Sequence, residues 1–440
     1  MQGDQTARVE VVTGSPSGLA EADVTPLTRR LADPGFFLTK DFHVLLRALR
    51  QQSPVHWCQP WPQRGFWALT RQAEMKVVAE QPILFSNETA GNIIPADPDA
   101  FRHNREAQGY GAVMSNVDPP RHTSLRGVYS RFFSGPRIAK LEEMCQSLAD
   151  EILDEIGERD TFDYVMDVAA HLPARLICRL LGVPANDWPF ITRYANSFAC
   201  FTDPALQLGS TPAETFLIAK DKTFGYVEEL VRQRRSTPED DLASMAATAQ
   251  VEGAPLGDYE AAWIAWSLLA AGFETSRNVI AGGLLALVEH PEQFEKLRAD
   301  SNLIHTAIHE MVRWTCPATG LLRVATHDTE LGGQAILKGD WVVMFLDSAN
   351  RDEAVFPDPD RFDISRVPNP YLSFGHGIHS CIGRMLALLE TKVMLRTTIE
   401  RFDEVNIDGP LEWSASTIAK GVKRMPVTVR RRDRIGRVTI

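Results

Sequence analysis

The segment from Phe374 to Gly383, which reads FGHGIHSCIG, constrains the fold of this 440-residue chain more than any other. A helical pattern, RMLALLETKVMLRTTIERF, follows directly, so Cys381 stands at the predicted start of a helix. That position directs backbone N–H groups and the positive end of the helix dipole at the sulfur, which favours the thiolate that a metal requires. Gly375 and Gly377, with Gly383, let the backbone turn tightly and approach a flat ligand. The segment predicts a metal-binding cysteine, or, for an isolated cysteine, a buried structural thiol beside a glycine-rich turn.

The complete spacing of the segment favours the first interpretation. It resembles the heme-binding signature of the cytochrome P-450 superfamily, Phe-Gly-x-Gly-x-His/Arg-x-Cys-x-Gly, and matches it at every fixed position. The resemblance implies a soluble bacterial-type heme-thiolate monooxygenase with heme b as cofactor. It makes Cys381 the axial ligand of the heme iron, whose electron donation favours cleavage of a bound O–O bond. It also implies that Phe374 lies against the heme and that His379 meets a heme propionate.

A second motif lies within residues 257–289, the longest predicted helix, where residues 270–276 read AAGFETS. Gly272 in a helix interior costs about 1 kcal/mol relative to alanine, which suggests close approach of a bulky group or a local distortion. Thr275 can bond back to the carbonyl of Ala271 and open the backbone hydrogen-bond ladder. The alternative is a plain buried helix that tolerates one glycine.

In company with Cys381, this motif resembles the oxygen-activating motif of the family, Ala/Gly-Gly-x-Asp/Glu-Thr. The resemblance gives Thr275 the role of ordering water beside bound dioxygen, and Glu274 that of relaying protons from outside. Many relatives carry aspartate in place of this glutamate. The same resemblance puts Ala271 and Gly272 against the heme.

The propionates of a heme require several cations or donors that converge on one edge of the group. Residues 118–126, DPPRHTSLR, resemble the family segment in which a histidine and an arginine on one helix face bind a propionate, here His122 and Arg126. Arg323 resembles the arginine that reaches the other propionate. Each residue alone is more simply a solvated surface charge, but with His379 they form a coherent set.

Glu310 and Arg313 are three residues apart on a predicted helix, where such a pair is usually a surface contact worth roughly 0.2–0.5 kcal/mol. Their place upstream of the cysteine segment matches the Glu-x-x-Arg of the family. The later FPDPDRFD resembles the family segment that supplies a third member, Arg361. We expect these three residues to form a structural lock without a chemical role.

The remaining patterns predict a mainly α protein with a smaller β region. Apolar residues at three-to-four spacing predict helices over 120–133, 138–156, 167–181 and 215–235. Alternating segments predict short strands over 53–70 and 323–346. The resemblance implies the cytochrome P-450 fold, a triangular helical prism that holds the heme between the long central helix and the helix after Cys381. We expect a loose arm over 1–23, one catalytic domain over 24–432 and a tail over 433–440.

Substrate identity resides in pocket shape, not in the heme motifs. A long loop over 88–116 is a candidate substrate loop, and residues 190–224 would form a roof that offers Tyr194, Phe198 and Phe201. By family analogy, the pocket would also be lined by Trp266, Ala270, Ala271, Thr319, Leu321, Leu322 and Thr417. For each of these residues, ordinary core packing is the alternative. A hydrophobic substrate is favoured, with terpenoids, steroids and branched lipids as the candidate classes.

Composition excludes several other classes of protein. A formal net charge of -11 argues against nucleic acid as a partner. Six cysteines without regular spacing fit a reducing cytoplasm and no zinc site. The apolar run from Ala261 to Phe273 is shorter than the roughly 20 residues that a membrane span requires, and no export signal is visible. We therefore expect a cytoplasmic monomer without a membrane anchor.

The leading hypothesis is a monooxygenase that uses O2 and electrons from NAD(P)H, delivered by a ferredoxin or a similar acidic carrier. Arg384, Lys392 and the arginines of residues 121–131 would form the docking face. Three alternatives stay open: a peroxide-using peroxygenase, a heme-thiolate enzyme that performs coupling, desaturation or epoxidation, and a non-catalytic heme-binding sensor or carrier. Retention of the acid-alcohol pair argues against the peroxygenase and the carrier.

Overall fold

The computed structural model of the protein describes residues 26–88, 90, 93–95 and 109–432. The arm predicted over 1–23, the tail over 433–440 and much of the candidate substrate loop lie outside these residues. Within them, no helix is long and apolar enough to cross a membrane.

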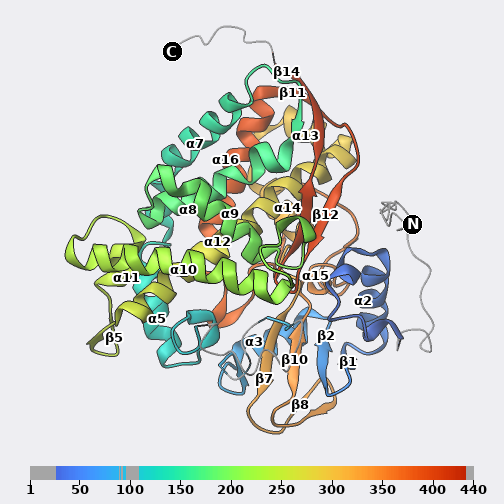
Figure 1. Ribbon diagram of the computed structural model, residues 1–440. Coiled ribbons are helices and arrows are strands. Elements are labelled where there is room, and N and C mark those ends of the chain that lie inside the picture. Colours follow the sequence, from blue (N-terminus) through green and yellow to red (C-terminus); the bar gives the residue numbers. More distant parts are fainter. Residues whose placement is uncertain (1–25, 89, 91–92, 96–108, 433–440) are drawn as a thin grey trace.

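Helices form most of the described chain, as predicted, and pack into the larger of two lobes (Figure 1). The central one is α12, Asp258–Glu289, whose 32 residues are unbroken. The others are α2 Lys40–Gln52, α3 Gln72–Glu80, α5 Arg121–Ser130, α6 Gly135–Ala139, α7 Glu142–Glu155, α8 His171–Leu181, α9 Trp188–Ala199, α10 Pro212–Ser236, α11 Leu242–Ala247, α13 Pro291–Ala299, α14 Ile304–Thr315, α15 Leu346–Ala349 and α16 Arg384–Arg401.

The smaller lobe is built on a five-stranded sheet of order β1-β2-β10-β7-β3. Its strands are β1 Val55–Trp61, β2 Arg64–Leu69, β3 Phe85–Ser86, β7 Leu321–Ala325 and β10 Trp341–Met344. Strand β10 pairs parallel with β2 and antiparallel with β7, so early and late segments of the chain meet in one sheet. The strands predicted over 53–70 and 323–346 are therefore confirmed.

Short strands outside this sheet support the helical lobe. Strand β14 joins β11 and β4 in a three-stranded sheet, and β12 pairs with β13 in a hairpin that packs against α12. A further pair, β8 with β9, continues the small lobe, and β5 pairs with β6. Their bounds are β4 Thr161–Asp163, β5 Gln250–Val251, β6 Ala254–Pro255, β8 Thr329–Leu331, β9 Gln334–Ile336, β11 Phe402–Ile407, β12 Glu412–Ala415, β13 Lys420–Arg424 and β14 Pro426–Arg431.

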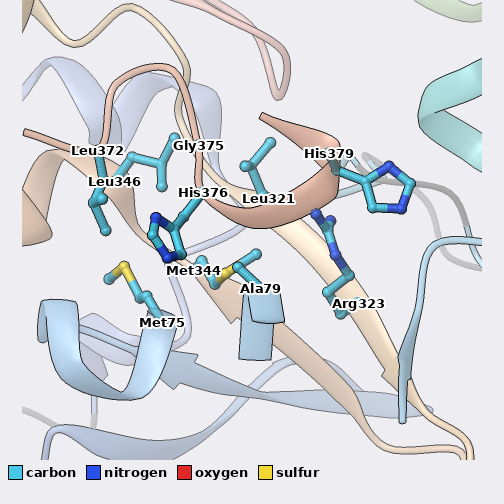
Figure 2. A pocket seen from close by; sticks show the side chains of 10 residues that line it. All are labelled: Met75, Ala79, Leu321, Arg323, Met344, Leu346, Leu372, Gly375, His376 and His379. Atoms are coloured by element: carbon cyan, nitrogen blue, oxygen red, sulfur yellow. The ribbon is translucent and has the colours of Figure 1, made fainter. Parts of the chain in front are cut away.

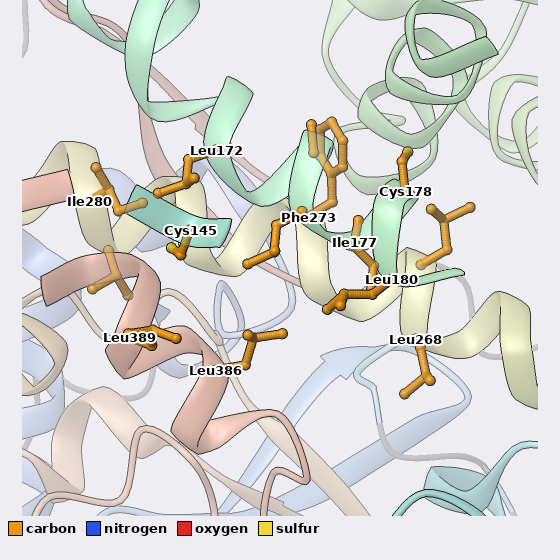
Figure 3. Packing of buried hydrophobic residues seen from close by; sticks show 14 of the residues in the cluster. Cys145, Leu172, Ile177, Cys178, Leu180, Leu268, Phe273, Ile280, Leu386 and Leu389 are labelled. Carbon is orange, nitrogen blue, oxygen red and sulfur yellow. The ribbon is translucent and has the colours of Figure 1, made fainter. Parts of the chain in front are cut away.

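Each lobe has its own hydrophobic core. In the helical lobe, α12 packs against α8 and α16, and Phe273 and Ile280 of α12 are buried among Leu172 and Ile177 of α8 and Leu389 of α16 (Figure 3). The small lobe buries residues of α2 with those of its sheet. Because α12 is covered by helices along most of its length, nearly every position on it is apolar or small, which explains why its sequence shows no polar face.

The helix predictions hold with shifted ends. The helix predicted over 138–156 is divided into α6 and α7 by two intervening residues, and the one predicted over 167–181 begins at His171 after a π-helical turn, Val165–Ala169. Such boundary differences are expected, because apolar periodicity continues through turns that remain buried.

Candidate active site

The loop before α16 has the backbone that its glycines predict. Gly375 and Gly377 have φ values of +70° and +68°, a region that side chains with a Cβ rarely adopt. A Cβ on Gly377 would overlap the carbonyl oxygen of Ala79 at the end of α3, so this glycine also permits a close approach. The loop closes where the N–H of Cys381 donates to the carbonyl oxygen of Phe374 at 2.8 Å.

Helix α16 begins at Arg384, three residues after Cys381. Desolvation by the surrounding protein raises the pKa of the Cys381 thiol, whereas the N–H groups of Gly383 and Arg384 and the positive charge of Arg126 act to lower it. The backbone N–H groups therefore point at the sulfur, as the helix-start position predicts. Cys381 is also the one exposed cysteine of the six, and none of the six is in a disulfide.

Basic side chains from three elements converge beside this cysteine. His122 and Arg126 come from α5, Arg323 from β7 and His379 from the loop itself. The ring centroids of His122 and His379 are 4.1 Å apart. Figure 2 shows the imidazole of His379 beside the guanidinium of Arg323, at one end of the small cleft beneath the loop. The four residues predicted as a set from distant sequence positions are thus brought together.

Within the described residues, no acid forms an ion pair with this basic cluster. His122 and Arg323 are 2% and 3% exposed. Burial lowers the pKa of Arg323 to about 10, and burial together with the charges of Arg323, His122 and Arg126 lowers that of His379 to about 3. Asp118 is near enough to act on Arg323 and His122 electrostatically, but it accepts hydrogen bonds from Ser86 and from the N–H of Asn87.

Hydrogen-bond accounting gives the same result. Both ring nitrogens of His122 and Nε2 of His379 are buried and lack a hydrogen-bond partner within the described chain. The one hydrogen bond from the Arg323 guanidinium to described residues is to the carbonyl oxygen of Leu322, at 2.7 Å. Buried cations and donors without partners cost several kcal/mol each, about the amount that an anionic ligand would recover. The donor set fits a buried group that carries two carboxylates.

Helix α12 has one face that the described residues leave partly open. In the middle of the helix, Ser267, Ala270, Ala271 and Thr275 are partly or fully exposed, and their spacing of three and four places them on one side. All four are small. The prediction that Ala270, Ala271 and Thr275 line an open site fits this face; Ser267 was missed, although the same spacing would have found it.

Thr275 donates from Oγ1 to the carbonyl oxygen of Ala271 at 3.0 Å, the back-bond that the sequence predicts. At Gly272, the close approach or helix distortion predicted from the sequence is not produced by the described residues of the protein. A Cβ there would meet Ile177 at 3.5 Å, an ordinary contact, and α12 continues through it without a break. Neither close packing by the protein nor a distorted helix explains this glycine.

Glu274 is buried beside Thr275, at 3% exposure. Its Oε1 accepts hydrogen bonds from the guanidinium of Arg277, from Nδ2 of Asn278 at 3.3 Å and from the thiol of Cys200 at 3.2 Å. Its Oε2 is buried without a partner in the described chain. Sequence reasoning identified the acid but missed its three partners; the spacing of three and four on one helix pointed to Arg277 and Asn278, whereas nothing local pointed to Cys200.

Comparison with known proteins identifies the family. A family model described as cytochrome P450 matches residues 193–410. A putative cytochrome P450 126 of Mycobacterium tuberculosis is 36% identical over 427 residues, which cover 94% of this chain and 99% of the relative. The chain belongs to the cytochrome P450 family. A second relative of this P450 is a linalool 8-monooxygenase of Pseudomonas putida, 32% identical over 378 residues, with 85% of this chain and 92% of the relative covered.

Solved structures agree with the sequence comparison. The structure of a Mycobacterium marinum cytochrome P450, CYP268A2, in complex with pseudoionone superposes on this P450 with a TM-score of 0.84 at 30% identity, covering 91% of this chain and 97% of that one. The fold is therefore the P450 fold. The protein is a cytochrome P450 monooxygenase with heme b as its cofactor.

The structural lock predicted for this P450 forms, with one member replaced. Arg313 donates from Nε and Nη2 to the two oxygens of Glu310, at 2.8 and 2.7 Å, and both side chains are fully buried. The third member predicted, Arg361, is wrong: it is exposed and gives only its carbonyl oxygen to Arg313. Arg366 takes its place and reaches Glu310 at 3.3 Å, since in this irregular segment the side chain of Arg366 points inward and that of Arg361 points outward.

Two of the residues predicted to line the substrate pocket belong to the cores of this P450. Leu322 is fully buried in the small lobe, on the opposite face of β7 from Leu321 and Arg323, so its assignment to the pocket is wrong. Trp266 is 6% exposed and donates from Nε1 to Thr223 of α10 at 2.8 Å, which makes it a core link between two helices.

The other pocket candidates stay predictions, and Thr319 and Thr417 are buried like Trp266, at 1% and 3% exposure. Thr319 donates from its hydroxyl to the carbonyl oxygen of Thr417 at 2.8 Å, so the chain before β7 is tied to the turn of the β12–β13 hairpin. Leu321, on the same face of β7 as Arg323, lines the cleft of Figure 2. In the roof, Phe198 and Phe201 pack against Phe216 of α10, whereas Tyr194 stacks with Phe190.

Proposed function

We propose that this P450 inserts one oxygen atom from O2 into a C–H bond of a hydrophobic small molecule of the terpenoid class, with electrons from NAD(P)H that arrive through a ferredoxin-type protein. The observation that carries the proposal is the convergence of the buried His122 and Arg323 with the partly buried Arg126 and His379 beside Cys381, with no ion pair to any of them within the described residues. Such a set matches a heme by its charge and donors, and it explains why these costly buried groups are retained.

In this proposal, Cys381 would hold the heme iron through its thiolate, and the N–H groups of Gly383 and Arg384 would stabilise the negative sulfur. Arg323 and His379 would hold one propionate, and His122 and Arg126 the other, in charge-assisted hydrogen bonds. Phe374, Ala271 and Gly272 would border the ring. The bound heme supplies the activation of O2.

In this proposal, Thr275 and Glu274 serve in the delivery of protons. Thr275 uses its hydroxyl to order a water molecule on the open face of α12, and its bond to the Ala271 carbonyl fixes the orientation of that hydroxyl. Glu274 passes protons inward through Oε2, the oxygen that no protein donor occupies. Since Oε1 is already saturated by three donors, the free oxygen is the one available for proton transfer.

The proposed substrate class rests on the lining of the site and on relatives. Ala270, Ala271, Leu321 and the chain around Thr417 offer small and apolar groups with few polar ones, which suits a hydrophobic ligand. One relative is named as a linalool 8-monooxygenase, and one solved relative holds pseudoionone. Both compounds are unsaturated acyclic molecules with a single polar group, so we propose a substrate of this kind.

The proposed docking face for the electron carrier is narrower than the one expected from the sequence. Lys392 forms an ion pair with Glu142 at 2.8 Å, and Arg121 pairs with Glu260 and Glu252. Arg384 and Arg131 are exposed and lack such a pair within the described chain. These two arginines are the cations that we propose an acidic carrier to meet.

The ligand assignment is tested by reducing the holoenzyme under carbon monoxide. We expect the red-shifted Soret band of a thiolate-bound heme, and its loss in Cys381→His. Cys145→Ala is the control, since this buried thiol lies in the helical core and should leave the band unchanged. A normal thiolate band in Cys381→His would refute the assignment.

The substrate class is tested by binding. A library of terpenoid, steroid and polyketide compounds is titrated into the oxidised enzyme while the low-to-high-spin Soret shift is followed. We expect acyclic terpenoids such as linalool to give the largest shifts. If only polar compounds produced a shift, the proposal of a hydrophobic pocket would be refuted. If steroids gave the largest shifts, the terpenoid assignment would be wrong, but the monooxygenase assignment would be unaffected.

A further inference from the structure

Glu274 of α12 lies at a junction of three parts of the fold. Arg277 and Asn278 hold its Oε1 from the same helix, and Cys200, the residue that ends α9, holds it from the roof. The third part is the β12–β13 hairpin, whose Lys420 gives its carbonyl oxygen to Nδ2 of Asn278 at 3.1 Å. The Glu274 carboxylate is therefore held by groups of α12 and by Cys200 of the roof, and Asn278 links it to the β12–β13 hairpin.

The hairpin is tied to the roof at the same place. The Sγ atom of Cys200 is 3.7 Å from the hydroxyl of Ser414 on β12, and Lys423 on β13 forms an ion pair with Asp203 at 2.8 Å. Gly421 sits against Asn278 so closely that a Cβ would overlap the amide. The roof therefore contacts the acid directly through Cys200, and the hairpin is linked to it through Cys200 and Asn278.

The Cys200 contact is a hydrogen bond from a neutral thiol. Cys200 is 4% exposed, and burial, together with the nearby charge of Glu274, raises its pKa to about 12. A thiolate at this distance would repel the carboxylate, whereas the protonated thiol donates to it. The sulfur therefore restricts the orientation of the Glu274 side chain, and only when the end of α9 is in place.

We propose that Cys200 is a positioning residue for Glu274: it holds Oε1 so that Oε2 stays free for proton transfer, and it makes the acid dependent on the position of the roof. This inference rests on the proposed role of Glu274 as the proton relay. Cys200 contacts neither substrate nor heme in this proposal, and it acts only through the carboxylate.

The contact is tested first by the infrared S–H stretch of the holoenzyme, which does not depend on turnover. The S–H band that disappears in Cys200→Ala belongs to Cys200. We expect this band at a lower frequency than the band that disappears in Cys178→Ala, because a hydrogen bond weakens the S–H bond. Cys178 is the matched control, a buried thiol of α8 without a hydrogen bond to described residues. In Glu274→Gln, the Cys200 band should shift and the Cys178 band should not. An unshifted Cys200 band would overturn the contact.

The role is tested by coupling, the fraction of NADPH electrons recovered in product, with the terpenoid that gives the largest spin shift. We expect Cys200→Ala to lower coupling about 2- to 10-fold, the effect of losing one hydrogen bond of ordinary net strength, since a thiol is a weak donor, and to release peroxide instead. Cys200→Ser, which keeps a donor, should recover most of it. Cys178→Ala, which removes the same sulfur elsewhere in the core, should couple as the wild type does.

A double mutant separates this inference from the proposed function. If Cys200 acts through Glu274, then Cys200→Ala has no further effect in the Glu274→Gln background. Equal additional losses in both backgrounds would overturn the positioning role. If Glu274→Gln uncouples the enzyme while Cys200→Ala does not, this inference alone fails; if Glu274→Gln couples normally, the proposed proton relay fails and this inference fails with it.

Discussion

The imidazole rings of His122 and His379 face each other with their centroids 4.1 Å apart, one from α5 and one from the loop before α16. Both ring nitrogens of His122 and Nε2 of His379 are buried without a hydrogen-bond partner in the described chain, and Arg323 and Arg126 lie nearby. We expect these groups to gain their hydrogen bonds only when the heme propionates bind. Changes at these residues should therefore affect heme binding more than folding.

Arg323→Ala should weaken heme retention without weakening the apoprotein. Its guanidinium is buried without an ion pair to the described residues, so its removal relieves the apoprotein of an unpaired buried charge. The same change deprives a propionate of a charge-assisted hydrogen bond worth roughly 1.5–3 kcal/mol. We expect heme transfer to apomyoglobin to be about 10-fold faster or more, with unchanged or higher apoprotein stability. Arg131→Ala, at the exposed end of the same region, is the control. A loss of stability in both forms would indicate a structural residue instead.

Arg366→Ala should destabilise the holoprotein more than Arg361→Ala. Arg366 donates to Glu310 and to the carbonyl oxygens of Pro357 and Asp358, whereas the side chain of Arg361 is exposed. We expect losses of about 1–3 kcal/mol for the first and within about 0.5 kcal/mol for the second in urea unfolding. The reverse order would restore Arg361 as the third member of the lock.

Gly377→Ala should be more harmful than Gly375→Ala. Both positions have a positive φ, so each substitution strains the backbone by about 1 kcal/mol. Only at Gly377 would the new Cβ also overlap the Ala79 carbonyl. We expect a lower melting temperature and a lower heme content for this variant. Equal effects at the two positions would show that contact with α3 is unimportant.

The free energy of unfolding should decrease with rising pH because of Glu390. Burial between α16 and α12 raises the pKa of this carboxyl to about 8, although a hydrogen bond with Ser276 acts to lower it. The folded state therefore keeps a proton that the unfolded state releases above its pKa of about 4.3. Stability contributed by this group is full at lower pH and is lost as the pH rises toward 8.

Glu390→Gln removes that loss, because the amide stays neutral. We expect the free energy of unfolding of the variant, relative to wild type, to increase between pH 5 and pH 8. Glu143→Gln, an exposed position on α7, is a suitable control and should show no such trend. Parallel curves for Glu390→Gln and wild type would contradict the raised pKa.

Thr275→Ala should uncouple the enzyme. Its hydroxyl lies on the open face of α12 next to Glu274, and we expect product per NADPH to fall by about 10-fold or more while peroxide rises. Ser267→Ala, two turns earlier on the same face, removes a similar hydroxyl that bonds to the Ile264 carbonyl, and it should couple nearly as well as the wild type. Unchanged coupling in Thr275→Ala would refute its role.

Sequence reasoning was most successful where function fixes residue type and spacing together. Cys381, the four basic residues and the Thr275 back-bond all depend on local backbone geometry or on a specific ligand. The structure brings the basic residues together beside Cys381 and forms the back-bond, as expected. The failures have a different cause. Arg361 and Arg366 both lie in an irregular segment, and which of them points inward is decided by a turn that periodicity does not describe.

The pocket prediction for Leu322 failed for a related reason. Leu322 differs from Leu321 only in the face of β7 that it occupies, and this register is set by pairing with β10 rather than by its own sequence. Cys200 contacts Glu274 only because α9 ends where it does. Such contacts between distant segments are created by packing, and a single sequence does not reveal them.

The parallel pairing of β2 with β10 has a consequence for synthesis of the protein. Strand β2 emerges from the ribosome early, but the strand that covers its second edge, Trp341–Met344, comes only after α14, so most helices of the helical lobe are made before it. Until then the β1–β2 hairpin presents an open strand edge, with Trp67 on it, to any neighbouring nascent chain. Expression yield should therefore depend on chaperones and on translation speed through residues 70–340 more than on the stability of the finished fold.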